Sequence, residues 1–381
     1  MKILKIEFSN IGLFTEGLIF DFTATDRVAD PSYVTKIKDR VYTQQIVGIA
    51  GINASGKSTA LKLLKCAFDI VVGGKSLDQL VIPKNIIVDQ SQISVDFILD
   101  GTIYRVDSVV ELKHSTISDS GATYNYKSER LYQKQLKRVT TKKSLYDFKD
   151  QDLLYDRDKL NKDAVAFLKP TDSILFAVTR DAETYYGDMI DDTNFNMYLV
   201  KGSAPMPLIN LFDDSILEID LTDESLKVTF KADTSEYEYV NPVNAQQVLS
   251  SGTIKGGNLI FKVTKALRTG GYLLIDEIEN HMHKDLVLAT LSLFADIDIN
   301  KLGATLVFTT HYSEILDAME RKDNIYITLK NDDYSCSLIK FSDAVQRNDV
   351  KKSEIFLSNY IDETAPTYEC IMNVRKYIWQ E

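Results

Sequence analysis

Nine consecutive residues near the N-terminus have the types and the spacing of a phosphate-binding loop. Residues 51–59 read Gly-Ile-Asn-Ala-Ser-Gly-Lys-Ser-Thr, in which four residues separate two glycines and Lys-Ser follows the second. The backbone N–H groups of such a loop point inward, and the start of the next helix adds partial positive charge. The pattern therefore predicts phosphate contacts by Gly51, Asn53, Ala54, Ser55, Gly56, Lys57, Ser58 and Thr59.

The roles within this loop follow from side-chain chemistry. Lys57 is expected to reach the β- and γ-phosphates of a nucleotide, and Ser58 to ligate Mg²⁺. The neighbouring segments favour this interpretation over a glycine-rich turn before an ordinary helix. Residues 46–50 form a short apolar run typical of a buried strand, and residues 59–68 have apolar residues at helical spacing.

A second stretch places two carboxylates at the end of an apolar strand. Residues 271–275 read as a buried strand, and Asp276 and Glu277 follow it directly. Ligand sites of α/β proteins lie at the carboxyl ends of parallel strands. Because side chains alternate along a strand, the two carboxylates take different directions and different tasks. Asp276 suits the Mg²⁺ shell, and Glu277 suits polarising an attacking water. The alternative is a solvated acidic turn.

Residues 249–253, Leu-Ser-Ser-Gly-Thr, precede a predicted helix about 25 residues before Asp276. Ser251, Gly252 and the helix start could hold a γ-phosphate. Alone, these residues equally describe an ordinary helix cap. Since the first loop already cradles the phosphates of its own chain, this second anion site is expected to serve the nucleotide of another subunit.

The few histidines are treated individually. His311 ends a buried strand at residues 304–310, where it could contact the γ-phosphate and sense hydrolysis. His281 and His283 resemble a metal pair, but a spacing of two diverges on a helix and no third ligand is evident, so a zinc site is rejected.

Composition limits the remaining classes. The chain has 381 residues, 44% of them hydrophobic, and a formal charge of -11, so unselective attraction of nucleic acid is not expected. Three scattered cysteines favour a reducing cytoplasm. The N-terminus alternates like a strand and is not a signal peptide, and no run of about 18 apolar residues predicts a membrane span.

The middle of the chain is less informative. Two β-rich runs, 93–99 and 102–106, flank Asp100-Gly101 and predict a hairpin. Residues 24–45 read as polar and irregular. A basic stretch with interleaved tyrosines then allows either a nucleic-acid or partner contact or, as the favoured interpretation, the solvated face of a small lobe. Its basic residues are Lys127, Arg130, Lys134, Lys137, Arg138, Lys142 and Lys143.

Together these motifs resemble those of the ATP-binding-cassette ATPases of the SMC, RecF and OLD type. The closest likeness is to OLD-like ATPases of bacterial abortive-infection (AbiL-type) and phage-defence operons. The matching stretches are residues 51–59 (phosphate loop), 249–253 (signature), 275–280 with His283 (Walker B and D-loop), 309–311 (switch region), and 347–349 with Tyr360 (tail).

The resemblance implies ATP and Mg²⁺ as cofactors and a nucleotide-sandwich homodimer, or a higher oligomer, in which each signature completes the other subunit's site. Two departures stand out: Lys284 follows His283 where many relatives have Pro, and only Gln90 and Gln92 are candidates for the Q-loop glutamine. No acidic cluster on a βαβ pattern follows His311, so a nuclease of the system is expected in another protein.

The sequence thus predicts an α/β fold, a P-loop NTPase of the ABC ATPase head type, with a mixed sheet, flanking helices, an antiparallel β subdomain and an inserted lobe. The expected divisions are residues 1–106, 107–240 and 241–381. The leading hypothesis is a cytoplasmic ATPase that senses a trigger and controls a separate effector, a nuclease or toxin, in anti-phage defence. The alternatives are a RecF-like DNA-repair ATPase and a non-hydrolysing scaffold.

Overall fold

The structure of the chain is a computed structural model that divides into two compact units, each assembled from separate stretches. Unit 1 comprises residues 1–26, 48–180 and 310–381, and unit 2 comprises residues 27–47 and 181–309. The structure describes residues 1–82, 86–114, 122–161, 166–190, 197–233, 236–239, 241–280, 282–345, 350–358, 360–361 and 368–379.

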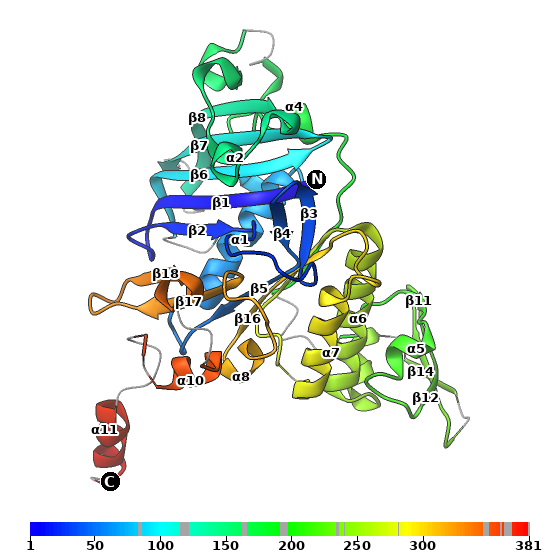
Figure 1. The fold of residues 1–381 in the computed structure, drawn as a ribbon. Coiled ribbons are helices and arrows are strands. Elements are labelled where there is room, and N and C mark those ends of the chain that lie inside the picture. Colours follow the sequence, from blue (N-terminus) through cyan, green and yellow to red (C-terminus); the bar gives the residue numbers. More distant parts are fainter. Residues whose placement is uncertain are drawn as a thin grey trace. The chain divides into compact units, whose positions relative to one another are not determined.

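Unit 1 contains a six-stranded antiparallel sheet whose strands lie side by side in Figure 1. Its order is β2 (Leu18–Asp21), β1 (Lys2–Ile11), β6 (Ile87–Leu99), β7 (Thr102–His114), β8 (Ala122–Gln135) and β9 (Leu153–Asp156). The hairpin expected at Asp100-Gly101 is confirmed, because both residues have positive φ angles, 48° and 72°, and Leu99 pairs with Thr102. The expected division between residues 106 and 107 falls inside β7.

One face of this sheet is apolar and packs on helix α1 (Lys57–Val71). The period of two along each strand selects the inward side chains. Ala67, Ile70 and Val71 of α1 and Ile93, Val95 and Val106 of the sheet line one small space between them. The predicted helix after the phosphate loop is therefore confirmed, and the sheet fixes its position.

A second sheet region of unit 1 supports the phosphate loop. Strand β5 (Ile46–Ala50) pairs in parallel with β17 (Ile325–Lys330), which pairs antiparallel with β18 (Cys336–Lys340). The division between the units falls inside β5, between Val47 and Gly48. Shorter elements of unit 1 are η1 (Leu77–Gln79), η2 (Leu136–Arg138), α2 (Lys142–Tyr146), η3 (Asp150–Asp152), η4 (Arg157–Lys159), α4 (Phe176–Thr179), α8 (Ser313–Leu316), α9 (Phe341–Ala344), α10 (Lys352–Leu357) and α11 (Tyr368–Trp379).

Unit 2 combines a parallel sheet with helices and a small antiparallel sheet. Strands β10 (Tyr186–Met189), β15 (Tyr272–Ile275) and β16 (Thr305–Thr310) are parallel. Helix α6 (Ser251–Thr269) contacts β10, β15 and helix α7 (Lys284–Ala295). The small sheet and its neighbours are β11 (Gly202–Ser203), β12 (Ile216–Leu221), β13 (Leu226–Phe230), β14 (Glu236–Tyr239), α5 (Met206–Ile209) and η6 (Pro242–Gln247).

The expectation of an irregular segment at residues 24–45 was wrong. This segment carries a hairpin of β3 (Val34–Lys38) and β4 (Val41–Gln44). Val34 and Val41 are buried, but charged residues around them conceal the short alternation. The order of strands and helices elsewhere agrees with the mixed α/β class, and no described helix has the length and apolar character needed to cross a membrane.

Candidate nucleotide-binding site

The phosphate loop connects β5 to α1 and depends on residues with positive φ. Ala54 has a φ of 61° and Gly56 a φ of 96°, and Gly56 is the N-cap residue of α1. A Cβ built at Gly56 would lie 2.9 Å from Phe14 Cζ and 3.1 Å from Cys336 Sγ. Because a left-handed φ and close neighbours coincide here, only glycine fits without strain.

The first glycine of the loop is constrained by close contact with β17. A Cβ at Gly51 would lie 2.3 Å from Thr328 Oγ1 and 2.5 Å from Ser55 Oγ. The same two hydroxyls share a hydrogen bond of 2.6 Å, and Ser55 Oγ donates to the carbonyl of Ile52 at 2.8 Å. Ser55 therefore closes the loop on itself and fastens it to the neighbouring strand.

Lys57 places a positive charge inside the loop. Its side chain is 4% exposed, and Nζ donates to the carbonyl oxygens of Gly51 and Ile52 at 2.8 Å each. Asn53 and Ala54 are exposed at the tip, while Ser58 is half-buried in the first turn of α1. A buried ammonium at the start of a 15-residue helix suits the charge of a nucleotide phosphate, so these residues fit the group that the sequence implies.

The two buried cysteines have no chemical part in this site. Burial raises the pKa of the Cys66 thiol to about 12 and also raises the pKa of Cys336. Both thiols therefore stay protonated at neutral pH, and Cys336 serves as packing against Gly56.

In unit 2, Asp276 and Glu277 follow β15 as the sequence predicts, and one threonine organises them. Thr309 Oγ1, at the end of β16, donates to Asp276 Oδ1 at 2.5 Å and accepts from the backbone N–H of Glu277 at 2.7 Å. The carbonyl of Thr309 accepts from the N–H of Ile278 at 3.1 Å. A single residue of the adjacent strand therefore fixes the carboxylate and the turn after it.

The two carboxylates differ in environment. Asp276 is 8% exposed, whereas Glu277 is only half-buried and has a φ of 49°. The left-handed backbone at Glu277 turns the chain, and its carbonyl accepts from the N–H of Asn280 at 2.8 Å. Carboxylate oxygens are ligands that Mg²⁺ prefers, which suits the well-fixed Asp276. The more accessible Glu277 suits a water-directed role.

Thr309 is a site residue whose role was not predicted. From the sequence, residues 309–311 are expected to form a switch region, with no link between Thr309 and Asp276. The available signal was chemical: Thr309 and Thr310 are both fully buried at the end of an otherwise apolar strand. Buried hydroxyls require partners, and two adjacent ones indicate a polar neighbour on the next strand.

The predicted signature stretch begins helix α6 in unit 2. Ser250 is the N-cap residue, and its Oγ accepts from the backbone N–H of Thr253 at 3.0 Å. Ser251 and Gly252 are the first two helical residues and are half-buried. The expected helix start is therefore confirmed, and it belongs to a helix of 19 residues.

The histidines that the sequence singled out lie at different positions in the fold. His311 follows β16 directly, is half-buried and belongs to unit 1. His283 caps helix α7, where its Nδ1 accepts from the N–H of Asp285 at 3.4 Å. His281 lies outside the described residues. Within the described ranges, no group of three His, Cys, Asp or Glu residues could hold a metal ion.

The basic stretch is partly structural. Lys134 is buried, donates to the carbonyls of Ser144 and Asp147 at 2.8 Å and 2.7 Å, and lies 3.9 Å from the centre of the Phe148 ring. Burial lowers the pKa of this ammonium. Lys142 donates to backbone carbonyls of residues 24 and 25. The side chains that stay exposed are Lys127, Arg130, Lys137, Arg138 and Lys143.

Two features of the resemblance receive no structural support. Gln90 and Gln92, the candidates for the Q-loop glutamine, both lie in strand β6 and not in a loop. Residues 347–349 of the tail lie outside the described residues, and Tyr360 is exposed.

The phosphate loop before a helix and the paired acids after a buried strand define the class of P-loop NTPases. A family model described as "AAA domain, putative AbiEii toxin, Type IV TA system" matches residues 46–317, well over half of the chain. The chain belongs to this family, which confirms the predicted fold class and implies a nucleotide-binding ATPase domain. The description connects the family with abortive infection and toxin–antitoxin systems. No curated protein matches the chain.

The predicted site residues divide between the two units of the chain. Unit 1 holds the phosphate loop with its supporting residues, and it also holds His311. Unit 2 holds Asp276 and Glu277 with Thr309, and it also holds Ser251 and Gly252 at the start of α6.

Proposed function

We propose that this protein hydrolyses ATP with Mg²⁺. The observation that carries the proposal is the buried ammonium of Lys57, enclosed by a glycine loop at the start of α1. In this function Lys57 neutralises phosphate charge, Ser58 and Asp276 hold the metal ion, and Glu277 takes the proton of the attacking water. Bound Mg²⁺ supplies charge stabilisation at the phosphates.

The proposed active form is a head-to-head dimer or a higher oligomer. Ser251 and Gly252 begin a 19-residue helix, and helix starts attract phosphate. In the dimer this helix start contacts the nucleotide held by the phosphate loop of the partner subunit, and His311 contacts its γ-phosphate. This arrangement would make hydrolysis depend on assembly.

The proposed cellular role is control of a separate effector in anti-phage defence. The family's description supports this setting. A nuclease or another toxic protein is the proposed effector, with ATP turnover biasing the assembly between two states. RecF-like binding of DNA through the basic stretch has less support, because Lys134 and Lys142 donate hydrogen bonds to backbone carbonyls of this chain.

Replacing Glu277 with Gln tests hydrolysis. The variant should bind ATP as before but lose turnover by about 10²–10⁴-fold, because general-base catalysis contributes that much. ATP binding is measured by calorimetry and turnover by phosphate release. Glu224→Gln, at an exposed position of the same unit, is the matched control. Turnover of Glu277→Gln within about threefold of wild type would remove Glu277 from this role.

Mixing two inactive variants tests the shared site. Lys57→Ala damages the phosphate loop and Gly252→Asp damages the helix start, so each should be inactive alone. Mixed heterodimers contain one site with both parts intact and should regain part of the activity. An inactive mixture, with heterodimers demonstrated by differential tagging, would show that each chain builds its own site.

A further inference from the structure

The outer face of the antiparallel sheet in unit 1 has a covered part and an open part. Cross-strand pairing places outward side chains in rows that run from β1 through β6 and β7 to β8. One row consists of Lys5, Asp96, Arg105 and Tyr132. The next row consists of Glu7, Ser94, Asp107 and Arg130, and the third of Ser9, Gln92, Val109 and Ser128.

The charges of the first row alternate in sign, and the chain itself covers this row. Arg105 binds Asp96 through Nε and one terminal nitrogen, at 2.8 Å and 2.9 Å. Aromatic rings of the segment at and after α2 cover these charges. The ring centre of Tyr146 lies 4.5 Å from Lys5 Nζ, and that of Phe148 lies 4.9 Å from the Arg105 guanidinium.

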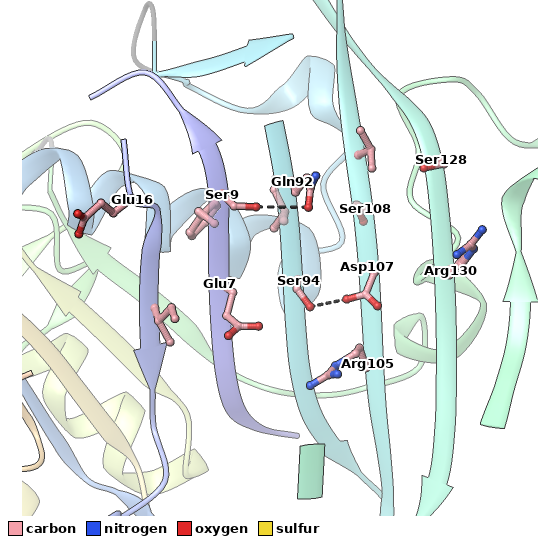
Figure 2. A pocket seen from close by; sticks show the side chains of 14 residues that line it. Glu7, Ser9, Glu16, Gln92, Ser94, Arg105, Asp107, Ser108, Ser128 and Arg130 are labelled. Carbon is pink, nitrogen blue, oxygen red and sulfur yellow. Dashed lines mark hydrogen bonds between the residues drawn. The ribbon is translucent and has the colours of Figure 1, made fainter. Parts of the chain in front are cut away.

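The second and third rows form the floor of an open hollow of about 620 Å³, which Figure 2 shows. Hydrogen bonds stiffen this floor: Ser94 Oγ donates to Asp107 Oδ1 at 2.5 Å, and Ser9 Oγ donates to Gln92 Oε1 at 3.3 Å. Glu16 stands at the rim (Figure 2). The hollow is within the size range of about 300–1,000 Å³ that is usual for ligand sites.

The charges in the hollow are arranged differently. Three carboxylates line it, those of Glu7, Glu16 and Asp107, together with the guanidinium groups of Arg105 and Arg130. Of these two cations, Arg105 is already bound to Asp96. Glu7 has Lys5 as an ion-pair partner at 3.0 Å, but the carboxylate of Glu16 makes no ion pair or hydrogen bond to any described residue. In the second row the neutral Ser94 lies between Glu7 and Asp107, where the first row alternates in sign.

The charges and polar groups of the hollow favour some kinds of ligand over others. Adjacent strands are about 4.8 Å apart, so Glu7 and Asp107 lie roughly 10 Å apart across Ser94, and one cation above Ser94 could attract both. Phosphates of a nucleic acid would meet three carboxylates, whereas of the two lining arginines Arg105 is already bound to Asp96. The one aromatic residue of the lining, Phe8, is buried and offers no ring for base stacking. Serine hydroxyls and the Gln92 amide suit the hydrogen bonds of a peptide backbone.

We propose that this hollow docks an extended basic peptide segment of a partner protein, with a Lys or Arg side chain above Ser94 between Glu7 and Asp107. Arg130, at the other end of the row, would meet a carbonyl or carboxylate of the same segment. The covered row provides the physical precedent, because there the chain places its own segment over charges that alternate in sign. The proposal goes beyond ATP hydrolysis and does not depend on it.

Fluorescence anisotropy with labelled synthetic peptides tests the proposal on the full chain. The probes are a twelve-residue Lys-Ser repeat, the matching Glu-Ser repeat and a single-stranded oligonucleotide. The Lys-Ser peptide should bind at least about tenfold more tightly than either other probe at low salt, and its affinity should fall as salt rises. Added ATP should leave this preference in place.

Two variants of equal charge change locate the binding. Glu16→Lys with Asp107→Asn should weaken the Lys-Ser peptide by about tenfold. Glu320→Lys with Asp332→Asn changes the charge by the same amount at exposed positions outside the hollow and should change affinity by less than about twofold. Glu16→Lys alone, at an exposed loop position, should weaken binding by about threefold, which keeps the test valid if the double variant folds poorly.

Three outcomes would overturn the proposal. They are equal weakening by both double variants, binding of the oligonucleotide that depends on Glu16 and Asp107, and self-association of the chain that the hollow variant abolishes. The ATPase rate is measured on the same preparations. If the wild-type chain fails to bind the Lys-Ser peptide but hydrolyses ATP, only the docking site is rejected. If it binds the peptide but does not hydrolyse ATP, only the proposed function is rejected.

Discussion

The phosphate loop and the acidic strand end are held in different ways. Both follow a buried strand and both turn through a residue with positive φ. The loop is fixed by several contacts at once, because glycines meet neighbouring strands closely and Ser55 and Lys57 bind its carbonyls. At the acidic end, three hydrogen bonds come from one residue, Thr309: two through its hydroxyl and one through its carbonyl. Shape therefore dominates one motif, and hydrogen bonds from a single residue of the neighbouring strand dominate the other.

The largest effect is expected from Gly51→Ala. The added methyl would lie 2.3 Å from Thr328 Oγ1 and 2.7 Å from the Thr328 carbonyl, so the loop or β17 must shift. A displacement of about 1 Å in a catalytic loop costs on the order of 10²-fold in rate. We expect ATP binding and turnover to be lost while the fold is kept. Wild-type affinity in this variant would show that close packing at Gly51 does not fix the shape of the loop.

A smaller effect, chiefly on stability, is expected from Thr309→Val. The shape is kept, but the Asp276 carboxylate and the N–H of Glu277 each lose a partner in a buried setting. A hydrogen bond to a charged group contributes about 1.5–3 kcal/mol to the free energy of unfolding, and urea denaturation measures its loss. Thr309→Ser keeps the hydroxyl and is the control. If Val and Ser variants are equally stable, the hydroxyl is not what holds the acidic end.

The smallest effect is expected from Thr328→Val on the loop side. Its hydroxyl also bonds a buried partner, but Ser55 retains its hydrogen bond to the carbonyl of Ile52. The loss should therefore be about 0.5–1.5 kcal/mol in the free energy of unfolding. Both variants are measured under the same conditions. A larger loss of stability for Thr328→Val than for Thr309→Val would contradict the expectation that the loop, which several contacts hold, tolerates the loss of one.

Local patterns made much of this structure predictable. The glycine loop, the Asp100-Gly101 hairpin and the buried strands before Asp276 and His311 each carry their signal within a few residues. Such features depend on backbone conformation and burial, which neighbouring residues determine.

Contacts between residues that are distant in the chain could not be predicted from the sequence. Thr309 binds a carboxylate 33 residues earlier in the chain. Lys134 belongs to a charged stretch that is typical of a solvated face, yet its side chain is buried and donates to the carbonyl of Asp147. The division of the chain into interleaved units is likewise invisible, because no composition change marks the crossing inside β5. These features depend on which segments meet, and no short window of sequence contains that information.

The partner of Ser55 has a consequence for synthesis of the protein. Thr328 lies 273 residues later in the chain, and Cys336, which packs on Gly56, lies later still. During translation the glycine loop leaves the ribosome long before the strands that support it. Contacts so distant in sequence close late in folding. A nascent or prematurely released chain therefore contains the sequence of the motif but not its folded conformation. We expect nucleotide binding only after β17 and β18 have been synthesised and have paired.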